Sequence, residues 1–206
     1  MKALAQSLNL NVGHILAGIL MACLWGWFAY WHVQAFLIAN DWSYFYLCIS
    51  ETLIALCFLV RKCPKSVSAA PFDWAIAVVG TFASFLFIPA SSGILPSAKY
   101  AVIAGSVLTI LGIISLNRSF ALVASKREIK TSGLYCVVRH PLYASYLLTF
   151  TGYIFANSTL ENVIVYFFTM GCMFIRMFRE ERHLSLDAEY LRYTHEVRWR
   201  LIPFVF

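Results

Sequence analysis

The stretch WSYFYLCISETLIALCFLV, residues 42–60, contains one charged side chain, Glu51, in an otherwise apolar run. A helix needs about 20 predominantly apolar residues to cross the hydrocarbon core of a bilayer, and this run has that length. Five more apolar blocks lie at about 12–38, 72–90, 98–116, 141–157 and 160–178. The 206-residue chain is 61% hydrophobic and only 13% charged, unlike an ordinary soluble domain. The sequence therefore predicts an all-α integral membrane protein, a bundle of about six transmembrane helices.

The block 141–157 is the least regular of the six, because it is short and carries several polar side chains. These are Tyr143, Ser145, Tyr146 and Thr149. Polar groups at membrane depth are tolerated where they face protein or a water-filled cavity. We therefore expect this fifth helix to be short or broken and to line a cavity.

The charge of the chain supports the same class of protein. A formal net charge of +6 would suit nucleic acid, but the basic residues cluster in loops between apolar blocks and form no single basic face. With six spans, Lys99 alone among the loop cations falls on one side, and the positive-inside bias makes the other side cytoplasmic. We expect a multi-pass protein of a bacterial inner membrane, with both termini and the 117–140 loop cytoplasmic and no nucleic-acid partner.

Neither cysteine nor histidine spacing indicates a metal or a disulfide framework. The six cysteines are scattered, and no C-x-x-C pair is followed by a second ligand pair. The histidines without metal-like spacing are His14, His32, His183 and His195. The sequence therefore predicts no metal site.

Two polar segments are candidates for chemistry. Residues 117–143 form a loop too long for a bare helix connection, and such loops are often functional. Residues 178–206 begin with the adjacent carboxylates Glu180 and Glu181, and leucines among charges then suit an amphipathic helix on the membrane surface. We expect one membrane domain, 1–206, with its polar chemistry on one face.

These segments together resemble a known family. LNRSF…REIKTSGLYCVVRHPLYASYLL, followed by EERHLSLDAEYLRYTHEVRWRLIP, is similar to the membrane-embedded isoprenylcysteine carboxyl methyltransferases and their bacterial relatives. That family includes more distant phospholipid N-methyltransferases. The resemblance covers about 115–203 and departs at Leu134, where proline is usual, and at Ala144 or Ser145, where glycine is usual. It divides the chain into N-terminal spans, 1–97, and a methyltransferase core, 98–206.

The resemblance implies S-adenosylmethionine (AdoMet) as methyl donor, in a cytoplasmic pocket formed by the loop, the fifth and sixth helices and the C-terminal amphipathic helix. AdoMet needs acceptors for its cation and diol, donors for its carboxylate and aromatic faces for its cationic end. The cofactor-binding candidates are Tyr135, Val138, His140, Tyr143, Glu180, Glu181 and Tyr193, with Arg139 and the helix start at Pro141 as further donors.

The acceptor decides which residues are catalytic. A carboxylate is already a nucleophile and needs only alignment, for which Arg139 or Arg198 is the candidate. A protonated amine would first lose a proton to a carboxylate such as Glu181. We favour carboxyl O-methylation of an isoprenylcysteine-like substrate, with a phospholipid amine as the alternative. The expected partners are a lipophilic or lipid substrate and membrane lipids, with no obligate protein partner.

Simpler interpretations remain open for the same residues. Arg139 and His140 would also suit a helix anchored at the headgroups, and Tyr143 and Tyr193 an interfacial aromatic belt. The paired carboxylates would also suit solvated ion pairs with Arg176 and Arg179.

Glu51 lies near the middle of its span, where a carboxylate is a functional candidate. It either lines a gap for a lipid substrate or is protonated and hydrogen-bonded between helices, and we favour the second interpretation because no cationic partner is visible. A small transporter using Glu51 is the competing class, but it would need several polar groups in register.

Overall fold

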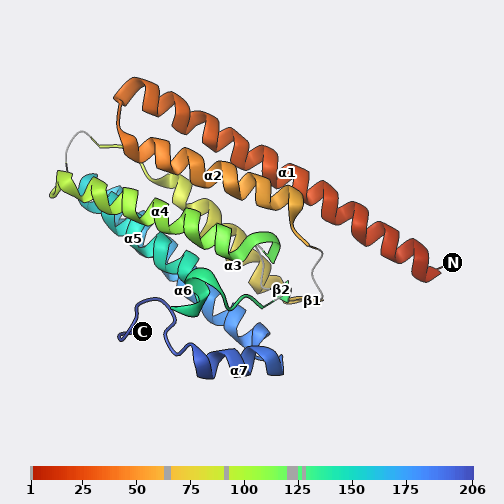
Figure 1. Cartoon of the computed structure of the whole chain (residues 1–206). Coiled ribbons are helices and arrows are strands. Elements are labelled where there is room, and N and C mark those ends of the chain that lie inside the picture. Colours follow the sequence, from red (N-terminus) through yellow and green to blue (C-terminus); the bar gives the residue numbers. More distant parts are fainter. Residues whose placement is uncertain (1, 63–65, 91–92, 120–124, 127–128) are drawn as a thin grey trace.

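The computed structural model describes residues 2–62, 66–90, 93–119, 125–126 and 129–206. Its α-helices are α1 (Lys2–Ala39), α2 (Trp42–Val60), α3 (Pro71–Phe82), α4 (Lys99–Leu116), α5 (Pro141–Ala156), α6 (Leu160–Leu184) and α7 (Ala188–Glu196) (Figure 1). Single 3-10 turns occupy Ala83–Leu86, Pro96–Ala98, Asn117–Ser119 and Gly133–Cys136. The strands β1 (Ser66–Val67) and β2 (Ser125–Lys126) form one short antiparallel pair. The predicted all-α architecture is confirmed.

Four helical segments of the described chain are long and apolar enough to cross a membrane: Gly13–Ala39, Trp42–Val60, Pro96–Leu116 and Leu160–Leu184. The third predicted block gives only a shorter apolar helix, Pro71–Leu86. The fifth is a continuous helix of 16 residues, so it is short but not broken.

The expectation that block 72–90 is helical throughout was wrong. The Asn162 side chain accepts a hydrogen bond from the Ile88 amide at 2.9 Å and donates to the Ile88 carbonyl at 2.8 Å. Both backbone groups of Ile88 are thus taken by α6, and Pro89 has no amide to continue a helix. The helical segment ends at Leu86 because the Asn162 side chain, on another helix, takes the hydrogen bonds of the Ile88 backbone.

Hydrogen bonds that involve the segments between consecutive helices show that successive helices run in opposite directions. At one end of the bundle, the Leu95 amide donates to the Phe155 carbonyl at 2.9 Å, which joins the α3–α4 connection to the end of α5. At the other end, Ser66 pairs with Lys126, which joins the α2–α3 and α4–α5 connections. This alternation is the one that six successive crossings require. Residues 63–65, 120–124 and 127–128, including Cys63 and much of the expected cytoplasmic loop, lie outside the described residues.

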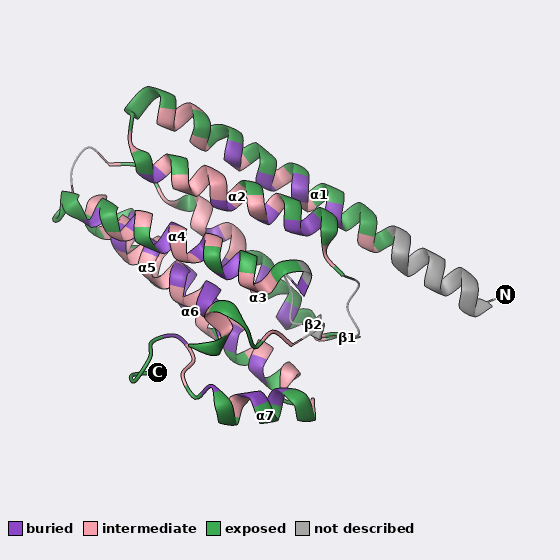
Figure 2. Ribbon diagram, in the orientation of Figure 1, coloured by how far each residue is buried: buried purple, intermediate pink, exposed green. Residues whose placement is uncertain are grey.

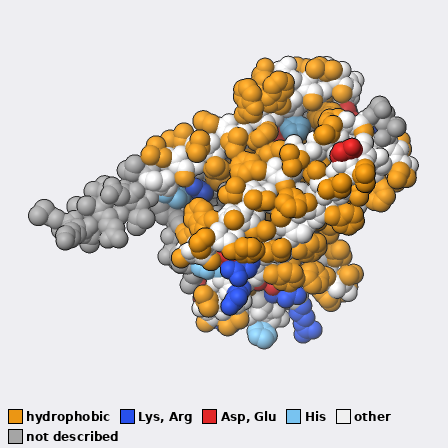
Figure 3. Space-filling model, turned by 180° about the vertical axis from the view of Figure 1, so that it is seen from behind, with side chains coloured by type: hydrophobic (Ala, Val, Ile, Leu, Met, Phe, Trp, Pro, Cys, Tyr) orange, Lys and Arg blue, Asp and Glu red, His pale blue; other side chains and the backbone are white. Residues whose placement is uncertain are grey.

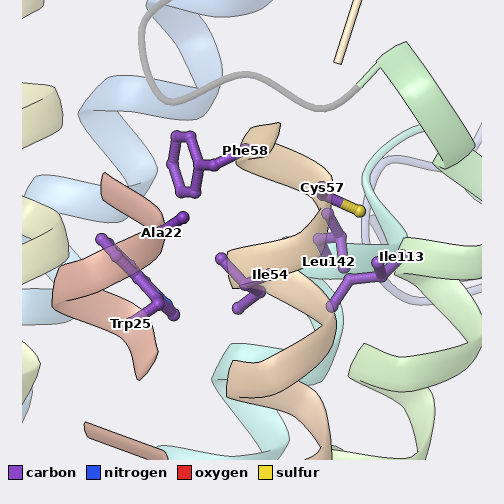
Figure 4. Packing of buried hydrophobic residues seen from close by; sticks show 7 residues of the cluster. All are labelled: Ala22, Trp25, Ile54, Cys57, Phe58, Ile113 and Leu142. Atoms are coloured by element: carbon purple, nitrogen blue, oxygen red, sulfur yellow. The ribbon is translucent and has the colours of Figure 1, made fainter. Parts of the chain in front are cut away.

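The α1–α2 hairpin is held to the rest of the bundle by a buried apolar cluster (Figure 4). The cluster comprises Ala22, Trp25, Ile54, Cys57, Phe58, Ile113 and Leu142, from α1, α2, α4 and α5. Helices α4 and α5 approach closely at Gly105, where a Cβ atom would meet the Thr149 side chain. This packing brings the N-terminal hairpin beside the segment that carries the candidate site.

The outer faces of the helices are exposed and apolar. Leu20, Leu37 and Ile38 of α1 are at least 64% exposed, and exposed residues alternate with buried ones along each helix (Figure 2). Figure 3 shows apolar side chains over most of the face seen from behind, with Lys and Arg gathered mainly at its lower end, where α7 and the C-terminus lie. Such a surface suits surrounding lipid along the helices and polar surroundings at one end.

Candidate active site

The Arg-His-Pro motif is held against the C-terminal segment by backbone hydrogen bonds. The Arg139 amide donates to the Trp199 carbonyl at 2.8 Å, and the His140 amide donates to the Arg200 carbonyl at 2.9 Å. Pro141 then begins α5, where its fixed φ suits the first helical position. Two segments about 60 residues apart therefore lie side by side at the mouth of the bundle.

The turn before the motif is fixed to the end of α4. Gly133 has a φ of +64°, and a Cβ atom there would collide with Ser115. The Ser115 hydroxyl accepts a hydrogen bond from the Leu134 amide at 3.2 Å. A glycine is required by both the dihedral angle and the space, so the G of the motif sets the path of the chain.

Glu181 is the centre of a buried cluster. Its Oε1 lies 2.8 Å from Arg139 Nη1 and 3.2 Å from His140 Nε2, and its Oε2 lies 2.8 Å from Arg200 Nε. The residue is 8% exposed. Both carboxylate oxygens are therefore engaged, and they join the motif, α6 and the C-terminal segment.

Glu180 lies in a different environment from its neighbour. Its Oε2 accepts a hydrogen bond from the Tyr143 hydroxyl at 2.9 Å, and its side chain lines a cavity that Glu181 does not line. The Arg176 guanidinium lies 5.6 Å from the centre of the Tyr143 ring, within cation–π range. Glu180 therefore offers a carboxylate to a molecule in the cavity.

Helix α7 covers this cavity with two buried tyrosines. Tyr190 is 3% exposed and Tyr193 is 4% exposed, and the Tyr193 hydroxyl donates to the Tyr135 carbonyl at 2.6 Å. Burial raises the pKa of both hydroxyls above the ordinary tyrosine value. Both side chains stay neutral and can donate hydrogen bonds.

The cavity has a volume of about 230 Å³ and reaches from this polar end into the bundle. Two donors at the polar end have no hydrogen-bond partner among the described residues, namely Arg139 Nε and the Tyr190 hydroxyl, and both atoms are buried. Buried donors without partners are unusual in folded proteins and indicate that a bound group completes them. Together with Glu180 they suit a ligand that carries both a cationic group and an anion.

Most of the predicted site residues meet at this cavity. Those that line it are Tyr135, Arg139, His140, Tyr143, Glu180 and Tyr193. Glu181 lies behind the lining, and Val138 is buried but does not line the cavity. The Arg198 side chain is exposed, and the structure does not bring it to the site.

Sequence reasoning missed three residues of the site. Tyr190 lies one helical turn before Tyr193, so the spacing of the two tyrosines was an available signal. Arg176 was considered only as an ion-pair partner of the carboxylates, although it lines the cavity. Arg200, which contacts Glu181, was not considered, whereas Arg198 was expected as a candidate to align the acceptor carboxylate; nothing in the local sequence distinguishes these two arginines.

A helical membrane bundle with cationic, carboxylate and aromatic side chains around a cavity at one end has the features of a membrane enzyme for a small charged ligand. Residues 94–186 match the family model described as phospholipid methyltransferase. This segment, a little under half of the chain, is similar to that family of membrane methyltransferases and contains α4, α5, α6 and the motif. None of the curated proteins compared with the chain is a significant match. The resemblance to membrane methyltransferases is confirmed.

Proposed function

We propose that the protein transfers the methyl group of AdoMet to the carboxylate of a lipophilic, isoprenylcysteine-like acceptor at the cytoplasmic face of the membrane. The observation that supports this most is the placement of Arg139, Tyr143 and Glu180 around one cavity that α7 covers. The family match supports methyl transfer to a lipid-related molecule.

The cavity residues fit AdoMet group by group. Glu180 can accept hydrogen bonds from the ammonium or the ribose hydroxyls, and the partnerless donors of Arg139 and Tyr190 can hold the carboxylate. The rings of Tyr135 and Tyr143 can face the cationic end. When bound, AdoMet would supply an electrophilic methyl group next to a neutral leaving thioether.

On the acceptor side, the chain has to align a carboxylate and exclude water. The acceptor oxygen provides the electron pair of the new O–CH₃ bond, so no proton has to be removed. Arg139 and Arg176 line the cavity and carry the positive charge that attracts an anionic acceptor. Glu181 is unsuited as a general base, because both of its oxygens already accept from cationic or donor groups.

A second candidate is methylation of a phospholipid amine. Glu180 lies at the cavity and would be the proton acceptor for a protonated amine. The family match is compatible with this candidate as well as with the first. In this case Glu180 would have two tasks, binding AdoMet and accepting the proton.

Methyl-labelled AdoMet separates these candidates. Membranes that contain the protein are incubated with labelled AdoMet, phospholipid and a farnesylated cysteine, and lipid products are identified by mass spectrometry against membranes without the protein. We expect a labelled, base-labile methyl ester. A labelled amine would instead support the second candidate, and no protein-dependent label in either class would contradict both proposals for these acceptors.

A further inference from the structure

The inner end of the cavity is unexpectedly polar for the middle of a membrane bundle. Glu51 lines it and lies about 14 Å along the axis of α2 from either end of that helix. Other polar side chains that line this end are Ser50, Ser84, Ser106, Thr109 and Thr149. A charged or polar wall at this depth is costly unless it serves a ligand or a structural contact.

Glu51 has a partner that the sequence did not reveal. His32 Nδ1 on α1 lies 2.8 Å from Glu51 Oε2 and 3.2 Å from the Phe28 carbonyl oxygen. A carbonyl oxygen can only accept, so a hydrogen on Nδ1 satisfies both contacts and makes Glu51 the acceptor of the pair. A hydrogen bond between helices is present, as the favoured interpretation required, and Glu51 also lines the cavity, as the other interpretation required. His32 is the potential cationic partner that was not visible in the sequence.

The hydroxyl groups around Glu51 also present acceptors to the cavity. Ser50 donates to the Leu47 carbonyl at 2.8 Å, and Ser106 donates to the Val102 carbonyl at 2.9 Å. Ser84 and Thr109 likewise donate to carbonyls of their own segments. Each of these four hydroxyls has one hydrogen, so what remains for a ligand is its lone pairs, whereas the buried Thr149 hydroxyl has no partner among the described residues and keeps its hydrogen. Glu51 and these hydroxyls form an acceptor-rich wall, which we call the inner site: Ser50, Glu51, Ser84, Ser106 and Thr109.

We propose that the inner site binds a hydrogen-bond donor, a hydroxyl or amino group, on the membrane-buried part of the methyl acceptor. A plain hydrocarbon chain would exclude water from the remaining lone pairs of Glu51 and of the hydroxyls and would offer them no hydrogen to accept, which is unfavourable. The acceptor is therefore a lipophilic molecule that carries a donor along its chain, and Glu51 is a specificity-determining residue. The identification of the ligand as the methyl acceptor rests on the proposed function. The binding of a hydrogen-bond donor does not, because it follows from the side chains of the inner site.

The test uses three probes with the same number of non-hydrogen atoms that differ at one end: octylamine, 1-octanol and heptyl methyl ether. Each is titrated calorimetrically into the detergent-solubilised protein, and the heat of partition into empty micelles is subtracted. We expect the amine and the alcohol to bind at least about tenfold more tightly than the ether, since the ether has no hydrogen to donate. In Glu51→Gln, which keeps the shape but replaces one acceptor oxygen with an amide donor, the amine should lose about tenfold in affinity.

A neighbouring residue on α2 gives the control. Thr52 is exposed, and its hydroxyl donates to the Cys48 carbonyl at 2.8 Å, so Thr52→Val alters α2 outside the cavity. This variant should bind all three probes like the wild type. Equal affinity of the wild type for the three probes, or an unchanged amine affinity in Glu51→Gln, would overturn the proposal. AdoMet is titrated separately; if it fails to bind the wild type, the proposed function fails, while the probe titrations still decide the inner site.

Discussion

The adjacent carboxylates Glu180 and Glu181 should respond differently to the same substitution. Glu180→Gln removes the negative charge that faces the cavity, and a hydrogen bond to a charged group contributes about 1.5–3 kcal/mol. AdoMet affinity should therefore fall by about tenfold to a hundredfold. Stability should change little, because among the described residues the hydrogen bond to the Glu180 side chain comes from the Tyr143 hydroxyl, and an amide oxygen can also accept it.

Glu181→Gln should mainly lower stability. The amide would place a donor against Arg139 or Arg200, both of which now donate to a carboxylate oxygen at 2.8 Å. Breaking a buried ion pair by changing one partner costs about 3 kcal/mol or more. For a protein of this size, that loss corresponds to a fall in Tm of about 6–12 °C. AdoMet affinity should fall less than in Glu180→Gln, because Glu181 acts through Arg139.

The assay combines isothermal titration of AdoMet with thermal unfolding of the same detergent-solubilised samples. Glu161→Gln is the matched control, since this exposed glutamate lies in the first turn of the same helix, at the opposite end from the site. It should leave both AdoMet affinity and Tm near the wild-type values. If Glu181→Gln loses as much affinity as Glu180→Gln and keeps the wild-type Tm, the division of roles drawn from the contacts is refuted.

Three further predictions concern the site and its orientation. If Arg139 orients the acceptor carboxylate and Tyr190 holds that of AdoMet, Arg139→Lys should lower turnover by about a hundredfold with AdoMet affinity changed less than about tenfold. Wild-type turnover in steady-state kinetics would contradict this, and a loss mainly in AdoMet affinity would place Arg139 at the AdoMet carboxylate. Because burial raises the pKa of Tyr190, the unfolded state loses that proton first, and stability should fall as pH rises above about 10; Tyr190→Phe should reduce this fall in an unfolding titration. A periplasm-active reporter fused to the C-terminus should stay inactive, and reporter activity would reverse the expected topology.

The membrane class and most helix positions could be predicted from local sequence. The block 42–60 coincides with α2, and the block 141–157 with α5 to within one residue. Whether a segment is stable in lipid depends mainly on its own composition. The bounds of α2 and α5 could therefore be predicted without the tertiary structure. The prediction of a helix over the whole block 72–90 was wrong because Asn162, more than 70 residues away, binds the backbone of Ile88.

The sequence by itself determined the helical class, the two polar segments and the residue types that suit a charged cofactor. Only the tertiary structure decided which of the two carboxylates faces the cavity, because neighbouring residues on a helix point about 100° apart and their surroundings come from other segments. It also decided that Arg200 rather than Arg198 meets Glu181, and that His32 meets Glu51 across two helices. These contacts join residues distant in the chain, and no local pattern records which distant side chains will face each other.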